Sequence, residues 1–375
     1  LIGGYVVDHT EHHQYWWANI LINSFFYFAV ALGAMFFYAL QYATEAAWSA
    51  TLKRIFEAMF QYILVGVGIL LLVIAAGQLH LHHLYHWMDP NVHDINHPDY
   101  DAIIAGKKPY LSAWFFWLRM LAYAGTFIYF ARKFREWSIQ EDTVGGTDLH
   151  FMQYRKGAVF LVFFAVFSST MSWDVLMSID THWYSTMYGW YIFSGMWVST
   201  MTFATLALVW LKKLGYFGNV NDSHIHDMGK WMFAISMLWS YLWFCQYMLI
   251  WYSDIPEEVT YFKERYEHYM GMMWTIFFVN FAVPFYALIA RDAKRNTKYL
   301  VRAGVIIFIS HFFDFYLAVI PGTTHAHETF TGWFELGLFI GFLGLFVRMF
   351  TTALTKANLI PVKHPFLEES NHHSI

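Results

Sequence analysis

The sequence predicts an all-α, polytopic integral membrane protein, and three observations support this fold class. The 375 residues are 58% hydrophobic and only 13% charged, so the chain has too few polar side chains to cover a soluble globule. The apolar residues gather into nine runs, each long enough to cross a hydrocarbon layer of about 30 Å as a helix. Lysine and arginine concentrate in alternate loops between these runs, as expected when positive loops stay in the cytoplasm.

The nine runs are expected to form a single transmembrane domain over residues 1–375. Without the first run, the remaining eight are compatible with two four-helix bundles, at about 57–211 and 230–353, with peripheral helices beside them. Short loops with helix-breaking residues such as Pro90 and Pro321 separate the runs. The predicted spans are 16–40, 57–85, 110–131, 153–178, 185–211, 230–253, 269–290, 300–320 and 331–353.

The loop charges predict the orientation of the chain. Eighteen of the 23 lysine and arginine residues lie in one set of alternate loops and four in the other, while Arg119 lies inside a span. The positive-inside rule therefore places residue 1 outside and the C-terminus in the cytoplasm. The predicted outer loops are instead rich in acidic residues and histidine, in segments 8–13, 89–101, 180–182, 254–267 and 325–328.

Composition also excludes several functions. The net charge is only -4 and no segment carries a basic stripe, so nucleic acid is not an expected partner. The single cysteine, Cys245, rules out disulfides within the chain, iron–sulfur clusters held by thiolates and covalently attached haem c. Redox centres of those kinds would have to belong to partner chains.

Four histidines crowd the end of the second predicted span, in the segment GQLHLHHLYHW. Helical spacing would place His82 and His86 on one face and His80 and His83 on another. Three interpretations stay open: an interfacial helix end, a proton relay or quinol contact by His80 and His83, and ligation of b-type haem or a metal.

The fourth and third predicted spans each bury a charged residue. Asp174 lies about one turn below the outer surface, where a carboxyl group that changes its protonation state would suit proton transfer or quinone contact. Arg119 is the only basic residue well inside a predicted span, and its permanent charge calls for a carboxylate such as Asp174. Arg119 is also a candidate for quinone contact. Asp180 and His182 follow at the span exit as weaker proton-transfer candidates.

The eighth predicted span contains the most informative pair, His311 and Asp314. Three residues apart, they share a helix face and could exchange a proton or form a static hydrogen-bonded pair. Glu257, Glu258 and Glu335 are further proton-transfer candidates in the outer half. The segment THAHE at 324–328 is too weak a pattern to predict a metal site. The inner ends of the spans show fewer polar groups, chiefly Glu57, Gln61 and Asn280.

Three long segments carry a resemblance to a known family. MSWDVLMSIDTHWYSTMYGWYIFSG at 171–195, SHIHDMGKWMFAISMLWSYLWFCQYMLIWYSDIPEEVTYF at 223–262 and YDAIIAGKKPYLS at 100–112 resemble the ActF family of membrane proteins from bacterial alternative complex III, a quinol:cytochrome c oxidoreductase. That family is similar to the quinol-binding membrane subunit of the same complex and, more distantly, to membrane subunits of polysulfide-reductase type. Its pattern has ten helices, so the resemblance implies one further helix before residue 1.

The resemblance implies a subunit of a respiratory complex in the bacterial inner membrane. Its partners would be the quinol-binding membrane subunit, an iron–sulfur subunit, multihaem cytochrome c subunits, small membrane subunits and a terminal oxidase, with lipid around them. The iron–sulfur clusters and haem c would lie on those partners, and quinone, as menaquinone or ubiquinone, is the one cofactor expected to contact this chain. The two leading hypotheses are a proton-conducting subunit and a structural scaffold. An independent secondary transporter would instead show broken helices and inverted repeats, which the sequence does not suggest.

Overall fold

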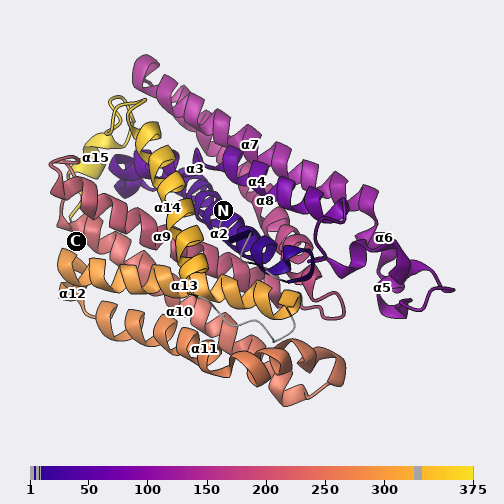
Figure 1. The fold of residues 1–375 in the computed structure, drawn as a ribbon. Helices are drawn as coiled ribbons and strands as arrows, with labels where there is room; N and C mark the ends of the chain where they lie inside the picture. The colour runs from indigo at the N-terminus through magenta and orange to yellow at the C-terminus, as the bar shows by residue number, and fades with distance from the viewer. Residues whose placement is uncertain (1–3, 6–7, 9, 325–331, 375) are drawn as a thin grey trace.

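The computed structural model describes residues 4–5, 8, 10–324 and 332–374, and every regular element among them is a helix (Figure 1). This confirms the all-α fold. The long helices are α2 (Gln14–Ala43), α3 (Lys53–Phe60) with α4 (Ile63–Gln78), α7 (Ala113–Val144), α8 (Asp148–Val175), α9 (Met187–Lys213), α10 (Asp222–Ser253), α11 (Pro256–Leu288), α13 (Thr297–Thr324) and α14 (Trp333–Leu354). The short ones are α5 (Ala102–Gly106), α6 (Lys108–Leu111), α12 (Arg291–Arg295) and α15 (Leu367–Asn371).

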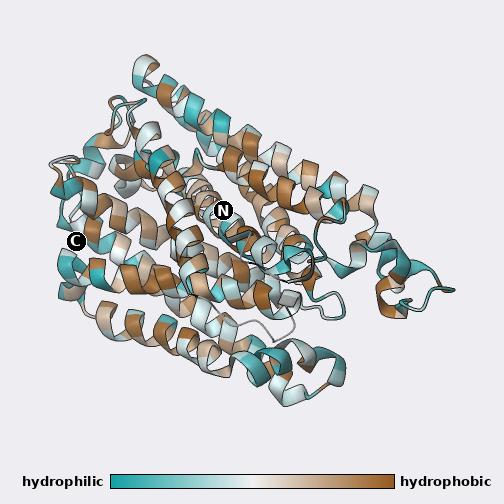
Figure 2. Cartoon of the chain, in the orientation of Figure 1, coloured by the Kyte–Doolittle hydropathy of each residue, from teal (hydrophilic) through white to brown (hydrophobic). Residues whose placement is uncertain are grey.

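Eight helical stretches in the described residues are long and apolar enough to cross a membrane. They correspond to every predicted span except the third, which confirms a multi-pass membrane protein. The third predicted span is α7, a helix of 32 residues that packs against α4 and α8. Arg119 and several tryptophan and tyrosine side chains lower its mean hydropathy, so α7 does not qualify by composition. Figure 2 shows apolar residues along the helices and hydrophilic residues gathered at their ends.

Helix α2 lies at the centre of the packing. Its apolar stretch is completely buried, and it packs against α3, α4, α8, α9, α13 and α14. A helix that is apolar on all sides is stable in this position, because every face meets another helix. The two predicted bundles did not include this first span. Since α9 packs against α2 and α8 as well as α10 and α13, the described helices form one continuous body, and the division into two bundles stays a prediction.

The contact between α2 and α9 depends on a glycine. Thr200 donates a hydrogen bond to the carbonyl of Val30 across the interface, at 3.0 Å. A Cβ atom on Gly33 would lie 2.2 Å from the Thr200 hydroxyl oxygen. Small residues allow membrane helices to approach this closely, so Gly33 sets the spacing of the two helices.

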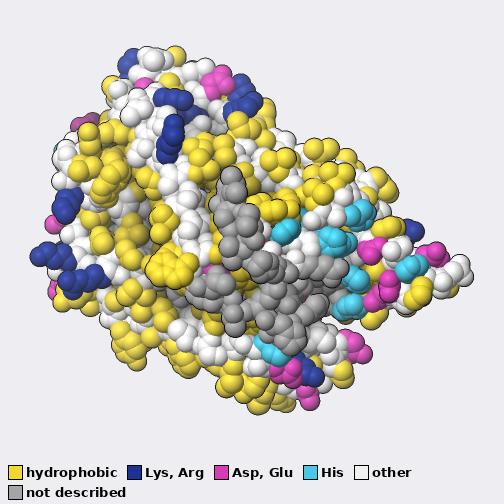
Figure 3. Space-filling view, viewed as in Figure 1, with side chains coloured by type: hydrophobic (Ala, Val, Ile, Leu, Met, Phe, Trp, Pro, Cys, Tyr) yellow, Lys and Arg dark blue, Asp and Glu magenta, His cyan; other side chains and the backbone are white. Residues whose placement is uncertain are grey.

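The two ends of the helix array differ in charge. The histidine-rich end carries residues 80–101, 180–182 and 254–267, and the basic end carries residues 44–53, 212–230, 291–302 and 356–363. Figure 3 shows histidine and acidic side chains gathered at one end, with lysine and arginine toward the other. Hydrogen bonds join separate segments at each end, as between His182 and Asp101 at the first and between Asn221 and His373 at the second. Which end faces the cytoplasm stays a prediction.

Three predicted span boundaries are wrong. The third predicted span, α7, continues to Val144 instead of ending near residue 131. The second span does not continue to residue 85, because α4 ends at Gln78 and His80 adopts a left-handed conformation with φ 57°. The helical face-sharing expected for the four histidines is therefore wrong as well. The seventh span begins at Pro256 rather than near 269, and only a distortion at Tyr269 marks the predicted start.

We predict that Gly33→Ala destabilises the protein by about 1–3 kcal/mol, because the added methyl group displaces Thr200 and breaks its bond to α2. Chemical unfolding in detergent micelles measures the effect. Gly68→Ala is the matched control, since a Cβ atom there meets nothing within 4 Å. Equal stability of the two variants would contradict the close α2–α9 contact.

Candidate functional site

An open cavity of about 770 Å³ occupies the histidine-rich end. The loop after α8, the first turns of α11 and the end of α13 form its walls, and the loop after α4 closes another side. Among its lining residues are His83, Asp180, His182, Trp183 and Tyr261. The structure thus brings two weaker candidates, Asp180 and His182, together with one of the candidate histidines.

Arg265 is buried behind Asp180. Only 3% of its surface is exposed, and its guanidinium donates to Asp180 at 3.3 Å and to the carbonyls of Tyr261 and Leu317 at 2.9 Å each. The guanidinium also lies 3.3 Å from the centroid of the Tyr261 ring. The sequence predicted Arg265 in an outer loop and Arg119 as the only embedded cation. Both predictions are wrong, because α11 starts earlier than expected and carries Arg265 between the helices.

Asp314 is buried beyond Arg265. Tyr191 of α9 donates a hydrogen bond to one carboxylate oxygen, and the indole of Trp239 on α10 donates to the other at 3.0 Å. A small cavity beside this carboxylate is lined by Tyr191, Asp314, Arg265 and Tyr261. Tyr261 lines both this cavity and the open one, so the two cavities are neighbours.

His311 lies beside Asp314, as helical spacing predicts, but the two do not form a hydrogen bond. His311 Nδ1 is 3.9 Å from the carboxylate oxygen, and the ring stands edge-on to Trp239 with centroids 5.1 Å apart. The histidine is completely buried and neither ring nitrogen has a hydrogen-bond partner. A movement of less than about 1 Å would bring the pair within bonding distance. The arrangement provides a proton acceptor and an unsatisfied imidazole side by side.

Arg119 and Asp174 form the ion pair that the sequence suggested. The guanidinium donates two parallel hydrogen bonds of 2.8 Å to the carboxylate, and Tyr123 donates a third at 2.9 Å. Arg119 also stacks on Tyr110, with 3.8 Å between the guanidinium carbon and the ring centroid. Because both charges are satisfied, the pair serves first as a clamp between α7 and α8.

The candidate histidines lie in a turn rather than on a helix. His80 and His83 are exposed, with ring centroids 6.4 Å apart, and His83 lines the open cavity. His82 is buried instead: its Nε2 lies 2.9 Å from the Val73 carbonyl and its ring fills the space over Gly77. Of the three interpretations, the first, a helix end, describes His82 best, because its ring folds back over the last turn of α4.

The remaining candidates lie apart from Asp314. Glu335 is buried and accepts a hydrogen bond from Tyr15, whose hydroxyl is 3.2 Å from that of Tyr316. Glu257 and Glu258 lie in the first turn of α11, where negative charge favours the helix N-terminus. The segment at 325–328 lies outside the described residues.

His182 pairs with Asp101 at 2.5 Å at the cavity rim. Partial burial acts to raise the pKa of Asp101, but backbone hydrogen bonds from Ile104 and Ile103 and the contact with His182 lower it overall. Asp101 thus both pairs with His182 and caps the N-terminus of α5.

The basic end holds a buried ionic network that the sequence did not predict. Glu57 accepts hydrogen bonds from Arg54 and Arg135 at 2.7 Å each and from Ser138 at 2.5 Å. Nearby, Lys53 donates to Glu141 at 2.5 Å. The expectation of few polar groups at the inner ends is wrong, because residues assigned to basic loops fold inward between α3 and α7. The pairing of Arg54 and Glu57 three residues apart was the available signal.

Comparison with known proteins does not assign a family. No family profile matches the chain, and no curated protein matches it significantly. The resemblance to the ActF family stays a prediction, and the geometry of the histidine-rich end carries the functional interpretation.

We predict that Asp174→Leu lowers the free energy of unfolding by about 3 kcal/mol, because it leaves the Arg119 charge unpaired between helices. The double variant Arg119→Leu with Asp174→Leu should recover most of this loss. Asp99→Leu, at an aspartate whose side chain is 66% exposed, is the control. A single Asp174 variant as stable as that control would contradict the clamp.

A second prediction concerns pH. Burial lowers the pKa of His82 to about 4, from 6.5 in an unfolded chain. As the pH falls, the unfolded state therefore binds a proton before the folded state does. The free energy of unfolding decreases by up to about 3 kcal/mol as the pH drops from 6.5 toward 4. His82→Gln should remove this part of the pH dependence, as measured by unfolding at a series of pH values. Identical slopes for wild type and variant would rule out a buried neutral histidine.

Proposed function

We propose that this chain is an integral membrane subunit of a respiratory quinol:cytochrome c oxidoreductase of the alternative complex III type, and that it conducts protons between Asp314 and the histidine-rich end. The observation that carries the proposal is the position of Asp314 and His311 directly behind the open cavity, with Tyr261 and Arg265 between them and Asp180. The positive-inside rule makes this end the outer, non-cytoplasmic one of a bacterial inner membrane.

The chemistry of these residues supports proton transfer. The hydrogen bonds to the Asp314 carboxylate come from two neutral donors, Tyr191 and Trp239. Asp174 differs, because Arg119 holds it in a bidentate ion pair. Between the two buried aspartates predicted from the sequence, Asp314 is therefore the better proton carrier.

Quinone fits poorly at two of the predicted contacts, Arg119 and Asp174, whereas a third, His83, lines the open cavity. The apolar cleft beside Tyr123, next to Arg119 and Asp174, has about 20 Å³ of free space, whereas ligand pockets usually measure about 300 Å³ or more. We therefore place quinol oxidation in the quinol-binding membrane partner, and the iron–sulfur clusters and haem c in the iron–sulfur and cytochrome partners. The proton transfer proposed for this chain would carry away the protons that quinol oxidation releases.

A scaffold without proton transfer is the second candidate, and the basic end favours it. Two carboxylates balance two guanidinium groups there, through ion pairs that tie α3 to α7: Glu57 pairs with Arg54 and Arg135, and Asp142 pairs with Arg54. Such static pairs hold helices in place without moving protons. In a scaffold, the Arg119–Asp174 ion pair would likewise hold α7 against α8.

We predict that His311→Gln combined with Asp314→Asn lowers quinol oxidation of the purified complex in liposomes by at least about tenfold, or its proton-to-electron ratio by at least about twofold, because the variant lacks both the buried carboxylate and the imidazole behind Arg265. Co-purification of the partner subunits with the variant shows that assembly is intact. His311→Gln alone serves as the milder variant if the double variant fails to assemble.

Glu267→Gln is the control, because this exposed glutamate of α11 belongs to the same end of the molecule and is not a proton-transfer candidate. Wild-type turnover and an unchanged proton-to-electron ratio in the assembled double variant would contradict proton transfer through this pair and favour the scaffold.

A further inference from the structure

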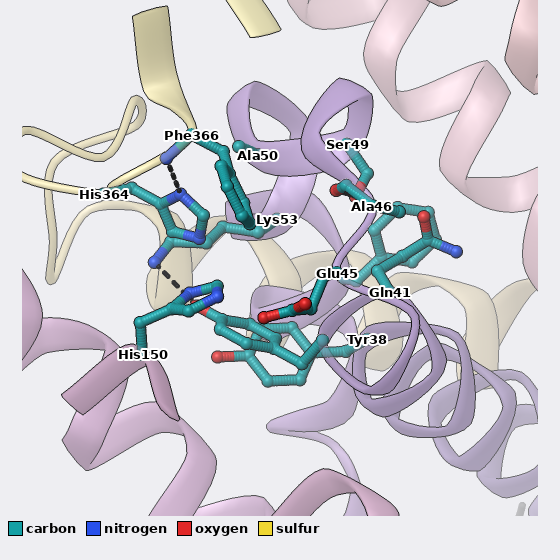
Figure 4. Close-up of a pocket in the computed structure, with 12 residues that line it drawn as sticks. Tyr38, Gln41, Glu45, Ala46, Ser49, Ala50, Lys53, His150, His364 and Phe366 are labelled. Carbon is teal, nitrogen blue, oxygen red and sulfur yellow. Dashed lines mark hydrogen bonds between the residues drawn. The ribbon is translucent and has the colours of Figure 1, made fainter. Parts of the chain in front are cut away.

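A small pocket at the basic end lies far from the site proposed above. It is formed by the end of α2, the turn η2 (Ala47–Leu52), the start of α8 and the C-terminal segment after α14 (Figure 4). His150 and His364 face one another on one side, with ring centroids 5.3 Å apart. The exposed Glu45 lines the same pocket, so the pocket reaches the protein surface.

Glu141 joins these two histidines from the end of α7. One ligand atom from each of the three side chains lies within 4.8 Å of the others. The three side chains are almost completely buried, at 0% exposure for Glu141, 3% for His150 and 8% for His364. The end of α7, the start of α8 and the distant C-terminal segment thus bring two imidazoles and a carboxylate to one point.

Several atoms of this cluster have no hydrogen-bond partner. Neither ring nitrogen of His150 makes a hydrogen bond, and Glu141 Oε1 has none either. Buried polar atoms are nearly always satisfied, so unpaired atoms on adjacent side chains indicate an absent ligand. The orphaned atoms are electron-pair donors on the side chains that borderline metal ions prefer.

We propose that Glu141, His150 and His364 bind a divalent transition-metal cation of the Zn²⁺ class, which fixes the C-terminal segment onto α7 and α8. Two histidines and a glutamate make a three-ligand zinc set that leaves one position for water. The pocket has about 20 Å³ of free space, enough for one water molecule.

The geometry requires only small movements. His150 Nδ1 is 4.0 Å from Glu141 Oε1, and two ligands at about 2.0–2.2 Å from a tetrahedral ion lie roughly 3.4 Å apart. Rotation of one side chain closes that difference. The ion would take Oε1, because Lys53 already binds Oε2 at 2.5 Å. The lysine charge opposes the ion, and the carboxylate of Glu45 at the same pocket offsets part of that repulsion.

The proposed ion would strengthen an existing attachment. The backbone of Val362 donates to Asp142 at 3.0 Å, and Lys363 donates to the Thr143 carbonyl at 2.6 Å. Both bonds tie the C-terminal segment to the end of α7. A metal held by His364 would add a third tie, this one reaching α8.

The test uses the full-length chain after removal of any affinity tag. Zn²⁺ retained after dialysis is measured by elemental mass spectrometry, and its affinity by competition with a chromophoric chelator. We expect one Zn²⁺ per wild-type chain, and His150→Gln or His364→Gln should weaken binding by at least about 100-fold, since loss of an outer-shell partner alone costs about 10–100-fold. His372→Gln, an exposed histidine of the same segment, should bind like wild type.

X-ray absorption at the zinc edge of the wild-type protein gives a readout that does not depend on how the variants fold. Imidazole scattering with a first shell at about 2.0–2.1 Å would support the site. Two results would overturn it: a wild-type chain that retains no Zn²⁺, or folded His150 and His364 variants that keep wild-type affinity.

Discussion

Lipid offers no counter-charge and no hydrogen bond to an ionised side chain, so each charge between the helices of this protein depends on a partner from the protein itself. The pairs found here cross between helices: Arg119 of α7 meets Asp174 of α8, Arg265 of α11 meets Asp180, and Arg135 of α7 meets Glu57 of α3. Removing one partner of such a pair costs about 3–5 kcal/mol. The lateral order of the helices around α2 is therefore fixed by charge as well as by apolar packing.

The exceptions to this pairing mark where chemistry is available. Asp314 receives hydrogen bonds from two neutral donors, and His311 beside it makes none. At the basic end, His150 and one oxygen of Glu141 are likewise unsatisfied within a buried pocket. Asp314 of the first group lines a small cavity that shares Tyr261 with the open one, whereas the second group is a compact set of metal-binding atoms. The same constraint thus separates static pairs from groups that can take up a proton or an ion.

The sequence predicted the features that depend on local patterns. Long apolar runs located the helices, loop charge located the two ends, and helical spacing placed His311 beside Asp314. Prediction from the sequence failed where the position of a side chain depends on which face of its helix meets which neighbouring helix. Arg265 was assigned to a loop because the charged residues before position 269 were excluded from the seventh predicted span. Its burial depends instead on hydrogen bonds to carbonyl groups of α13, about 50 residues away in the sequence. The histidines near residue 82 were placed on a helix because nothing local shows that His82 folds back over Gly77.

The proposed proton transfer requires that Asp314 changes its protonation state while the complex turns over. Infrared difference spectroscopy of the intact complex, triggered by quinol addition, measures this directly through the carboxylic acid carbonyl band. Proton transfer through Asp314 predicts a carbonyl difference signal in the wild type that disappears in Asp314→Asn and persists in Asp174→Asn. A difference spectrum that is the same in wild type and Asp314→Asn would contradict the claim, and would leave Asp314 as a buried packing residue.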